Sequence, residues 1–220
     1  MKTIRIFSAP HKALRKTMSD FMVLCGQTNF RKPESIEKLK KAGAEMFFLL
    51  TSHANTEDNF VLKALESKIP GAAEHDTLDH VKIEELQHNL ENHLNRLNAS
   101  ASEDEAHDFY LKFALFFSIY LEHIDEEETV TQQLIWENLS VEEQLSIHAS
   151  IVKKMDPAVY AIWLKYMIPA QNENENLAML DAISRNMPAD KFEVLMDTLA
   201  QNISPEKLNT LLQRVTEKAE

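Results

Sequence analysis

The chain contains few of the residues that β-rich, disulfide-bonded or membrane-spanning proteins need. It has three glycines in 220 residues, too few for a fold built on tight hairpin turns, and the long stretches between them are typical of helices. The single cysteine, Cys25, excludes an internal disulfide and a cysteine-based zinc finger. These shortages predict an all-α protein and are consistent with the reducing cytoplasm, where we expect it.

Positive charge and long apolar runs are also scarce. The net charge of −12 disfavours binding to nucleic acid or to an anionic membrane surface, because phosphate recognition needs clustered Lys and Arg. No apolar run approaches the roughly 18 residues of a membrane-spanning helix. The N-terminus, MKTIRIFSAPHK, lacks the apolar stretch of a signal peptide. We therefore expect neither nucleic acid nor a membrane as a partner, and no sequence pattern identifies a protein partner.

Turn-forming residues divide the first part of the chain into four long helices. We expect Ser8 to cap the first helix, with Pro10 in its first turn, and Pro70-Gly71 to end the second. Short loops between long helices predict an up-down four-helix bundle. The predicted helices span residues 8 to about 26–30, 33 to about 68, about 72–97 and about 104–136.

The rhythm changes after residue 138. Ser140 and Glu143 have the spacing of a capping box. Prolines then divide the remainder into four or five short amphipathic helices, with further starts near Asp156-Pro157 and Ser204-Pro205. We therefore expect two domains, a four-helix bundle over residues 1–138 and a C-terminal helical extension over residues 139–220.

Two of the long helices contain polar residues within their apolar stripes. Each inserts a His-x-x-x-Glu pair, His53–Glu57 in the second helix and His123–Glu127 in the fourth, while His11 heads the stripe of the first. Burying an ionised carboxylate costs several kcal/mol unless it is paired or bound to a cation. These positions therefore predict a metal site, with a buried hydrogen-bond network as the alternative. The stripes are Met46, Leu50, His53, Glu57, Phe60 and Ala64 in the second helix, and Phe113, Phe116, Tyr120, His123, Glu127, Val130 and Leu134 in the fourth.

The third helix leaves two candidate histidines open. His75 and His80 flank its apolar stripe on opposite sides, about 140° apart, so one centre is not expected to receive both. The apolar stripe itself consists of Ile83, Leu86, Leu90, Leu94 and Leu97. Outside the stripes, we expect a solvated surface at His88, His93 and His107, and at the acids next to Glu127, which are Asp125, Glu126 and Glu128.

The order of these elements, one per helix, resembles the hemerythrin-like (HHE cation-binding) family. It reads His11, then His53-Ala-Asn-Thr-Glu57, then His80, then His123-Ile-Asp-Glu-Glu127. The stretches LLTSHANTEDNFVLKAL and YLEHIDEEETV resemble the family's second and fourth helices. DHVKIEEL resembles the third helix and favours His80 over His75. The resemblance covers about residues 8–138, and the stretch from LSVEEQL onward is similar to a helical region in some bacterial members.

The resemblance implies a left-handed four-helix bundle around a non-haem di-iron centre. Its nitrogen ligands would be His11, His53, His80 and His123, and its bridging carboxylates Glu57 and Glu127. Oxygen-carrying hemerythrins supply two histidines four residues apart from the third helix. Here the matching residues are Asp76, four before His80, and Asp79, four after His75, which argues against a fifth histidine ligand and against simple reversible oxygen carriage.

Imidazole and carboxylate ligands suit iron, with zinc or manganese as alternatives. Open metal positions in an aromatic pocket would admit O₂ or NO, so we expect a ligand-binding or sensing protein rather than a metabolic enzyme. A metal-regulated interaction module is a second hypothesis. A ferritin-like di-iron oxidase is a third, but that class needs Glu-x-x-His on two helices and only Glu85-x-x-His88 fits. The expected pocket residues are Phe47, Phe48, Phe113, Phe116, Phe117 and Tyr120.

Overall fold

The computed structural model describes residues 4–200, apart from the side chains of residues 186 and 189, and throughout these residues it contains helices and no strand. This confirms the predicted all-α class. The chain divides into two compact units, Met1–Lys153 and Lys154–Glu220. The predicted domain boundary at residue 138 stays a prediction, because the first unit also includes most of the helix that follows it.

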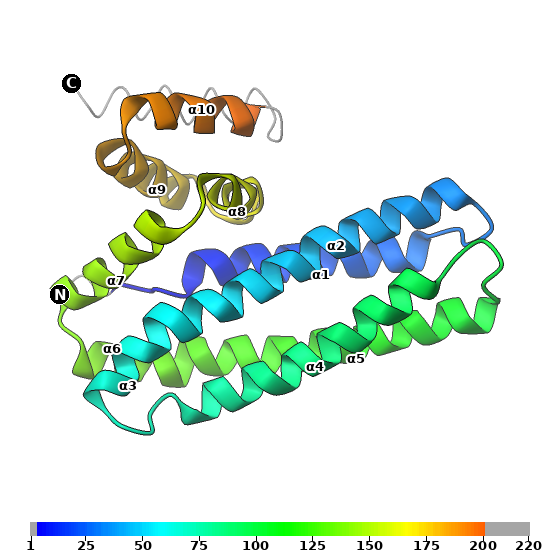
Figure 1. The fold of residues 1–220 in the computed structure, drawn as a ribbon, viewed down its shortest axis with the longest axis horizontal. Helices are drawn as coiled ribbons and strands as arrows, with labels where there is room; N and C mark the ends of the chain where they lie inside the picture. Colours follow the sequence, from blue (N-terminus) through cyan, green and yellow to red (C-terminus); the bar gives the residue numbers. More distant parts are fainter. Residues whose placement is uncertain (1–3, 201–220) are drawn as a thin grey trace. The chain divides into compact units, whose positions relative to one another are not determined.

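The first unit is built on four long helices that lie side by side (Figure 1). Short connections make successive helices antiparallel, and the first and third of them each pack against the second and the fourth. The predicted up-down bundle is therefore confirmed. The four helices are α1 (Ser8–Gln27), α2 (Pro33–Thr56), α4 (Glu74–Arg96) and α5 (Glu103–Glu126).

The helix starts agree only partly with the expected caps. Pro33 occupies the first turn of α2, and α5 begins with a capping box in which Ser102 and Glu105 bond each other's backbone N–H groups. The prediction for Ser8 is wrong: the N-cap of α1 is Phe7, which provides no side-chain hydrogen bond. The chain enters α1 through a turn at residues 6 and 7, so Ser8 is already helical.

Two of the long helices contain a π-helical segment. α2 continues through η1 (Glu57–Leu62) into α3 (Lys63–Lys68), and α5 continues through η2 (Glu127–Thr131) into α6 (Gln132–Asn138). Each π-helical segment begins at the glutamate of a His-x-x-x-Glu pair. Short π-helical segments within α-helices are frequent at functional sites, because the wider turn redirects side chains.

The π-helical segments shift the buried stripes by one residue, and this corrects the predicted core. After Glu57, the stripe continues through the buried residues Val61 and Leu65 instead of Phe60 and Ala64, and Leu62 is buried as well. After Glu127, the stripe continues through Thr131 and Ile135, with Gln132 also buried, whereas Val130 is 53% exposed and Leu134 only partly buried. The wider turn uses an extra residue, so the period of 3.5 holds up to each glutamate and fails beyond it.

Two further core predictions are wrong. Leu86 is 38% exposed and Gln87 is buried in its place, with its amide donating to the Phe47 carbonyl and the Thr51 hydroxyl. Phe48, predicted to line a buried aromatic pocket, is instead 42% exposed. In both cases the neighbouring residue along the helix takes the buried position.

One end of the bundle is covered by α7 (Val141–Lys154). Its predicted capping box is confirmed: Glu143 accepts from the Ser140 backbone N–H and donates its own N–H to the Ser140 hydroxyl. Ile147 and Ile151 then pack against a small buried cluster in the bundle. The cluster consists of Phe7, Val61 and Ile135.

The second unit contains short helices, as predicted. Asp156 caps the first of them, and Asn172 forms a capping box with Glu175 at the start of the second. The third packs against the other two. They are α8 (Pro157–Ala170), α9 (Glu173–Asn186) and α10 (Ala189–Ala200). The predicted start at Ser204-Pro205 lies outside the described residues. Among the described residues, no helix is long and apolar enough to cross a membrane.

Candidate metal centre

The six residues predicted to bind metal meet inside the bundle. Each of the four long helices contributes one imidazole, and each π-helical segment contributes the carboxylate with which it begins. No side chain of the six is more than 6% exposed. They are His11, His53, Glu57, His80, His123 and Glu127. Whether all six are ligands stays a prediction, but the structure brings every one of them to the same place.

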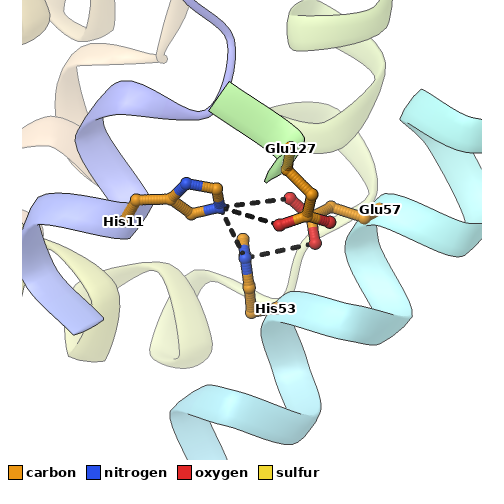
Figure 2. A group of neighbouring side chains, drawn as sticks. All are labelled: His11, His53, Glu57 and Glu127. Atoms are coloured by element: carbon orange, nitrogen blue, oxygen red, sulfur yellow. Dashed lines mark hydrogen bonds and ion pairs between the residues drawn. The ribbon is translucent and has the colours of Figure 1, made fainter. Parts of the chain in front are cut away.

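The first group of donors comprises His11, His53, Glu57 and Glu127 (Figure 2). The Nε2 atoms of His11 and His53 are 3.0 Å apart. His11 Nε2 also lies 3.3 Å from Oε2 of Glu127, and His53 Nε2 lies 3.1 Å from Oε2 of Glu57. Donors bound to one ion at about 2.1 Å have such separations, because right-angled bonds of that length end about 3.0 Å apart.

The second group comprises His80, His123 and Glu127. Both Nε2 atoms lie 3.5 Å from Oε1 of Glu127. Oε2 of the same carboxylate faces His11, so Glu127 spans the two groups. Glu57 also reaches the second group, since its Oε2 lies 3.5 Å from His80 Nε2.

Five of the buried donor atoms lack hydrogen-bond partners. Both oxygens of Glu57, both oxygens of Glu127 and Nε2 of His80 are buried without one. Leaving such groups unpaired is strongly unfavourable, and this is most costly for carboxylates. A cation between the groups satisfies all five atoms, so the donor set fits a metal centre better than a hydrogen-bond network.

Comparison with known protein families points to the same kind of site. Residues 2–135 match the hemerythrin HHE cation binding domain. The chain belongs to this family. Neither the comparison with curated proteins nor that with solved structures gives a match. Together with the buried His/Glu groups, the family match indicates a metal-binding helical protein.

The hemerythrin-like domain orients two of its imidazoles with carboxylates that the sequence analysis missed. Glu128 accepts from Nδ1 of His11 at 2.9 Å, and Asp58 accepts from Nδ1 of His80 at 2.8 Å. Such bonds fix the tautomer of a metal-binding histidine and raise its basicity. Arg15 donates to the same Glu128 oxygen at 2.7 Å. The expected solvated surface at Glu128 is therefore wrong.

A repeated sequence feature could have identified these acids. Each glutamate that begins a π-helical segment is followed at once by a second acid, as Glu57-Asp58 and Glu127-Glu128. The first acid of each pair faces the centre, and the second bonds a histidine from a different long helix. A helix places adjacent residues about 100° apart, so one pair can serve both purposes.

The pKa values of the histidines differ strongly within the metal-free cluster. Burial alone would lower the pKa of His11, but the carboxylates of Glu127, Glu128 and Glu57 outweigh burial and raise this pKa to about 10. For His80, burial is likewise outweighed by neighbouring carboxylates, and its pKa rises to about 11. Burial lowers the pKa of both His53 and His123.

The two central glutamates also differ. Burial, reinforced by the charge of Glu127, raises the pKa of Glu57 to about 7. Burial would raise the pKa of Glu127 as well, but His11 and His80 outweigh it and hold this pKa well below its usual range. Without metal, protons on two imidazoles thus provide the positive charge that the carboxylates need.

The end of the centre beside His11 is apolar. Phe7 is 1% exposed, and its ring stacks on the His11 imidazole with 5.4 Å between centroids. Val61 and Ile135, also buried, pack against Phe7. The N-terminal segment is held there because Gln132 accepts from the Ile6 backbone N–H.

The end beside His80 is polar. Asp76 lies one turn before His80 on α4 and is 3% exposed. Its Oδ2 accepts from the hydroxyl of Thr131, 2.7 Å away, and Thr131 lies four residues after Glu127. Burial raises the pKa of Asp76. Asp76 lies four residues before His80, where the resemblance to oxygen-carrying hemerythrins would place a second histidine.

The remaining candidates lie outside the centre. The side chain of His75 is 61% exposed and lies near Asp79 and Glu126, so α4 contributes His80 and not His75. Tyr120 is buried with its ring 6.0 Å from that of His123. Burial raises the pKa of Tyr120 well above its ordinary value, so the phenol stays protonated.

Proposed function

We propose that this hemerythrin-like protein holds a non-haem di-iron centre and binds or senses O₂, NO or iron. The main support is the position of Glu127, whose two oxygens face different histidine groups. A carboxylate that spans two sets of imidazoles suits a pair of ions, because each oxygen can bind one of them. Imidazole and carboxylate donors suit iron, with zinc or manganese as alternatives.

In this proposal, His11 and His53 would hold one ion, and His80 and His123 would hold the other. Glu57 and Glu127 could serve both ions, since each approaches both histidine groups. Bound iron would supply open coordination positions for a diatomic ligand. The protein's own contribution is a fixed donor set in a buried site.

Neighbouring residues make the site suitable for such a ligand. The central carboxylates offset the charge of the ions, and Asp58 and Glu128 add negative charge through the imidazoles that they bond. Buried Phe113, Phe116 and Tyr120 lie along α5 before His123 and limit the access of bulk water.

Anaerobic iron loading tests the proposal directly. We expect two ions per chain by elemental analysis, and a change in the visible absorption spectrum when O₂ or NO is added. His53→Ala should lose most of the bound iron, whereas the control His88→Ala, on the exposed surface of α4, should keep it. Folded protein without stoichiometric iron would contradict the proposal. Continuous O₂ consumption would indicate an oxidase instead.

A metal-regulated interaction module is a second candidate, because the described chain has a separate compact unit beyond the hemerythrin-like domain. If this unit reports the state of the metal, hydrogen exchange of residues 154–200 should change on iron loading. Identical exchange with and without iron would count against regulation.

The cytoplasm remains our expectation for the location, based on the single cysteine.

A further inference from the structure

A second group of possible ligands lies at the surface, next to the polar end of the centre. Nε2 of His75 lies 3.8 Å from Oδ2 of Asp79, and its Nδ1 lies 3.7 Å from Oε1 of Glu126. One donor atom from each of the three lies within 4.8 Å of the others. The side chains are 61%, 23% and 40% exposed, respectively, so this group is open to ions from solution.

A buried carboxylate lies behind this surface group. The side chain of Asp76 is 5% exposed, and its Oδ1 lies 3.6 Å from Nδ1 of His75. This contact is an ion pair when His75 is protonated, while Oδ2 accepts a hydrogen bond from Thr131. A buried carboxylate costs free energy unless it is paired or binds a cation. Asp76 directs one oxygen at a group of possible ligands, so it is placed to bind a cation.

The surface group and the centre adjoin along the chain. Asp79 directly precedes His80, Glu126 directly precedes Glu127, and Asp76 lies one turn before His80. The surface group and Asp76 therefore lie on the same two helical runs, next to the residues that supply inner donors. Lys82 is the competing positive charge, since its Nζ lies 2.7 Å from Oδ1 of Asp79. Oδ2 of Asp79 faces His75 instead.

Beside His11, at the other end of the centre, the described residues form no comparable group of exposed ligands. Phe7 covers His11 there and packs with Val61. The outer carboxylate at this end, Glu128, is already paired with Arg15, whose positive charge repels an approaching ion. The two ends thus differ in the outer side chains that they present to a cation: possible ligands beside His80, and an aromatic ring and a paired carboxylate beside His11.

We propose that His75, Asp79 and Glu126 form an outer divalent-cation site that supplies metal to the His80/His123 half of the centre. Asp76 is the buried ligand between this outer site and the centre. The ion keeps its charge and exchanges one set of ligands for the next, so no oxidant or reductant is needed. This inference rests on the proposed metal centre, but it assigns a role to residues outside that centre.

Cobalt(II) loading of the metal-free full-length protein tests the outer site. Equilibrium dialysis of the wild type should show a third, weaker ion per chain in addition to the two inner ones. In the same dialysis, H75N/E126Q should lose the weak ion. In stopped-flow absorbance, this variant should fill the centre about tenfold more slowly, which is the lower end of the rate enhancement that electrostatic steering provides. The inner stoichiometry should not change, because neither residue belongs to the centre.

Two further variants separate the steps. Asp76→Asn keeps an oxygen that can accept from Thr131, so the fold is preserved. It should keep the outer ion and still slow loading. The matched control H88N/E122Q changes an exposed histidine of α4 and an exposed glutamate of α5, and should load at the wild-type rate. Circular dichroism verifies that each variant folds.

The outcomes distinguish this inference from the proposed function. Normal filling of the centre at one common rate in H75N/E126Q, Asp76→Asn and the wild type would overturn the outer site and leave the di-metal centre intact. A folded wild type that takes up no cobalt into the centre would overturn both. Slower loading in the two variants, with an unchanged control, would support the outer site.

Discussion

At the scale of single residues, the hemerythrin-like domain depends on pairs of adjacent acids with different tasks. Glu57 and Glu127 face the centre, while Asp58 and Glu128 each bond an imidazole from a different long helix. Each pair therefore ties its own helix both to the site and to a neighbouring helix. Because the outer acids act through Nδ1 of a histidine, their influence on the metal is indirect but sensitive to charge.

Replacing Glu128 with Gln should weaken metal binding about 10–100-fold, the usual effect of losing a carboxylate behind a metal-binding histidine. The variant keeps the size of the side chain and an acceptor oxygen but removes the negative charge that pairs with His11 and Arg15. Competition titration with a chelator measures the loss. Glu122→Gln, an exposed position on α5, is the control. Equal affinities of wild type and Glu128→Gln would show that Glu128 has no influence on the ligand that it bonds.

Metal uptake should release protons. The pKa values of about 10 for His11 and about 11 for His80 mean that both imidazoles are protonated at pH 8 in the metal-free protein. A metal ion must displace these protons, so we expect about two to be released and the affinity to rise with pH up to those pKa values. Calorimetry in buffers of different ionisation enthalpy counts the protons. An observed enthalpy independent of the buffer would contradict this protonation state.

At the scale of helices, the hydrophobic period predicted the bundle and five of the six central residues, and the family resemblance added His80. Neither predicted the ends of the helices. Up to Glu57 and Glu127 the stripe follows the expected rhythm, because those segments are ordinary α-helix. Beyond them, the π-helical segments move burial to Val61 and Thr131. A periodicity analysis assumes one turn length, so it cannot find a local widening that depends on packing around the site.

Contacts between helices were equally beyond prediction from the sequence alone. His75 and His80 both flank the apolar stripe of their helix, and only the packing of α4 against α2 and α5 places His80 inside. Glu128 was expected in solvent because it lies off the apolar stripe of its own helix, next to Glu127. Its partners, His11 and Arg15, come from α1, more than one hundred positions earlier in the chain.

The close approach of α2 and α4 depends on one glycine. A Cβ at Gly43 would clash with the Leu94 side chain and crowd the Phe21 ring at 3.3 Å. We expect Gly43→Ala to reduce the free energy of unfolding by about 1–3 kcal/mol, as overpacking of a core does. Chemical denaturation of the metal-free protein measures the change.

Gly26→Ala is the matched control. A Cβ at Gly26, in α1, would meet Tyr110 at 3.5 Å, an ordinary contact. Alanine favours a helix over glycine by about 1 kcal/mol, so this variant should be neutral or more stable. If Gly43→Ala and Gly26→Ala destabilised the protein equally, crowding between α2 and α4 would not explain the effect at Gly43.

At the scale of the whole molecule, the hemerythrin-like domain encloses a centre whose donors come from all four long helices. A bound ion therefore links all four long helices at one place. The metal should stabilise the domain by the free energy of binding to the folded state alone.

Removing the metal should lower the melting temperature of the wild type. Free metal at about one hundred times its dissociation constant adds about 2.7 kcal/mol to the free energy of unfolding, and a chelator removes this gain. Differential scanning calorimetry before and after chelation measures the shift. His53→Ala should melt at one temperature under both conditions. An unchanged wild type would indicate that the centre takes up no ion.

The segment that begins at Glu127 also holds the start of the chain. Five residues after this glutamate, Gln132 accepts from the Ile6 N–H and donates to the Ile4 carbonyl, and the Trp136 indole donates to that same carbonyl. A carboxylate that moves when its ions change would therefore shift an indole within the same helical run. The fluorescence of Trp136 should therefore change with the occupancy of the centre.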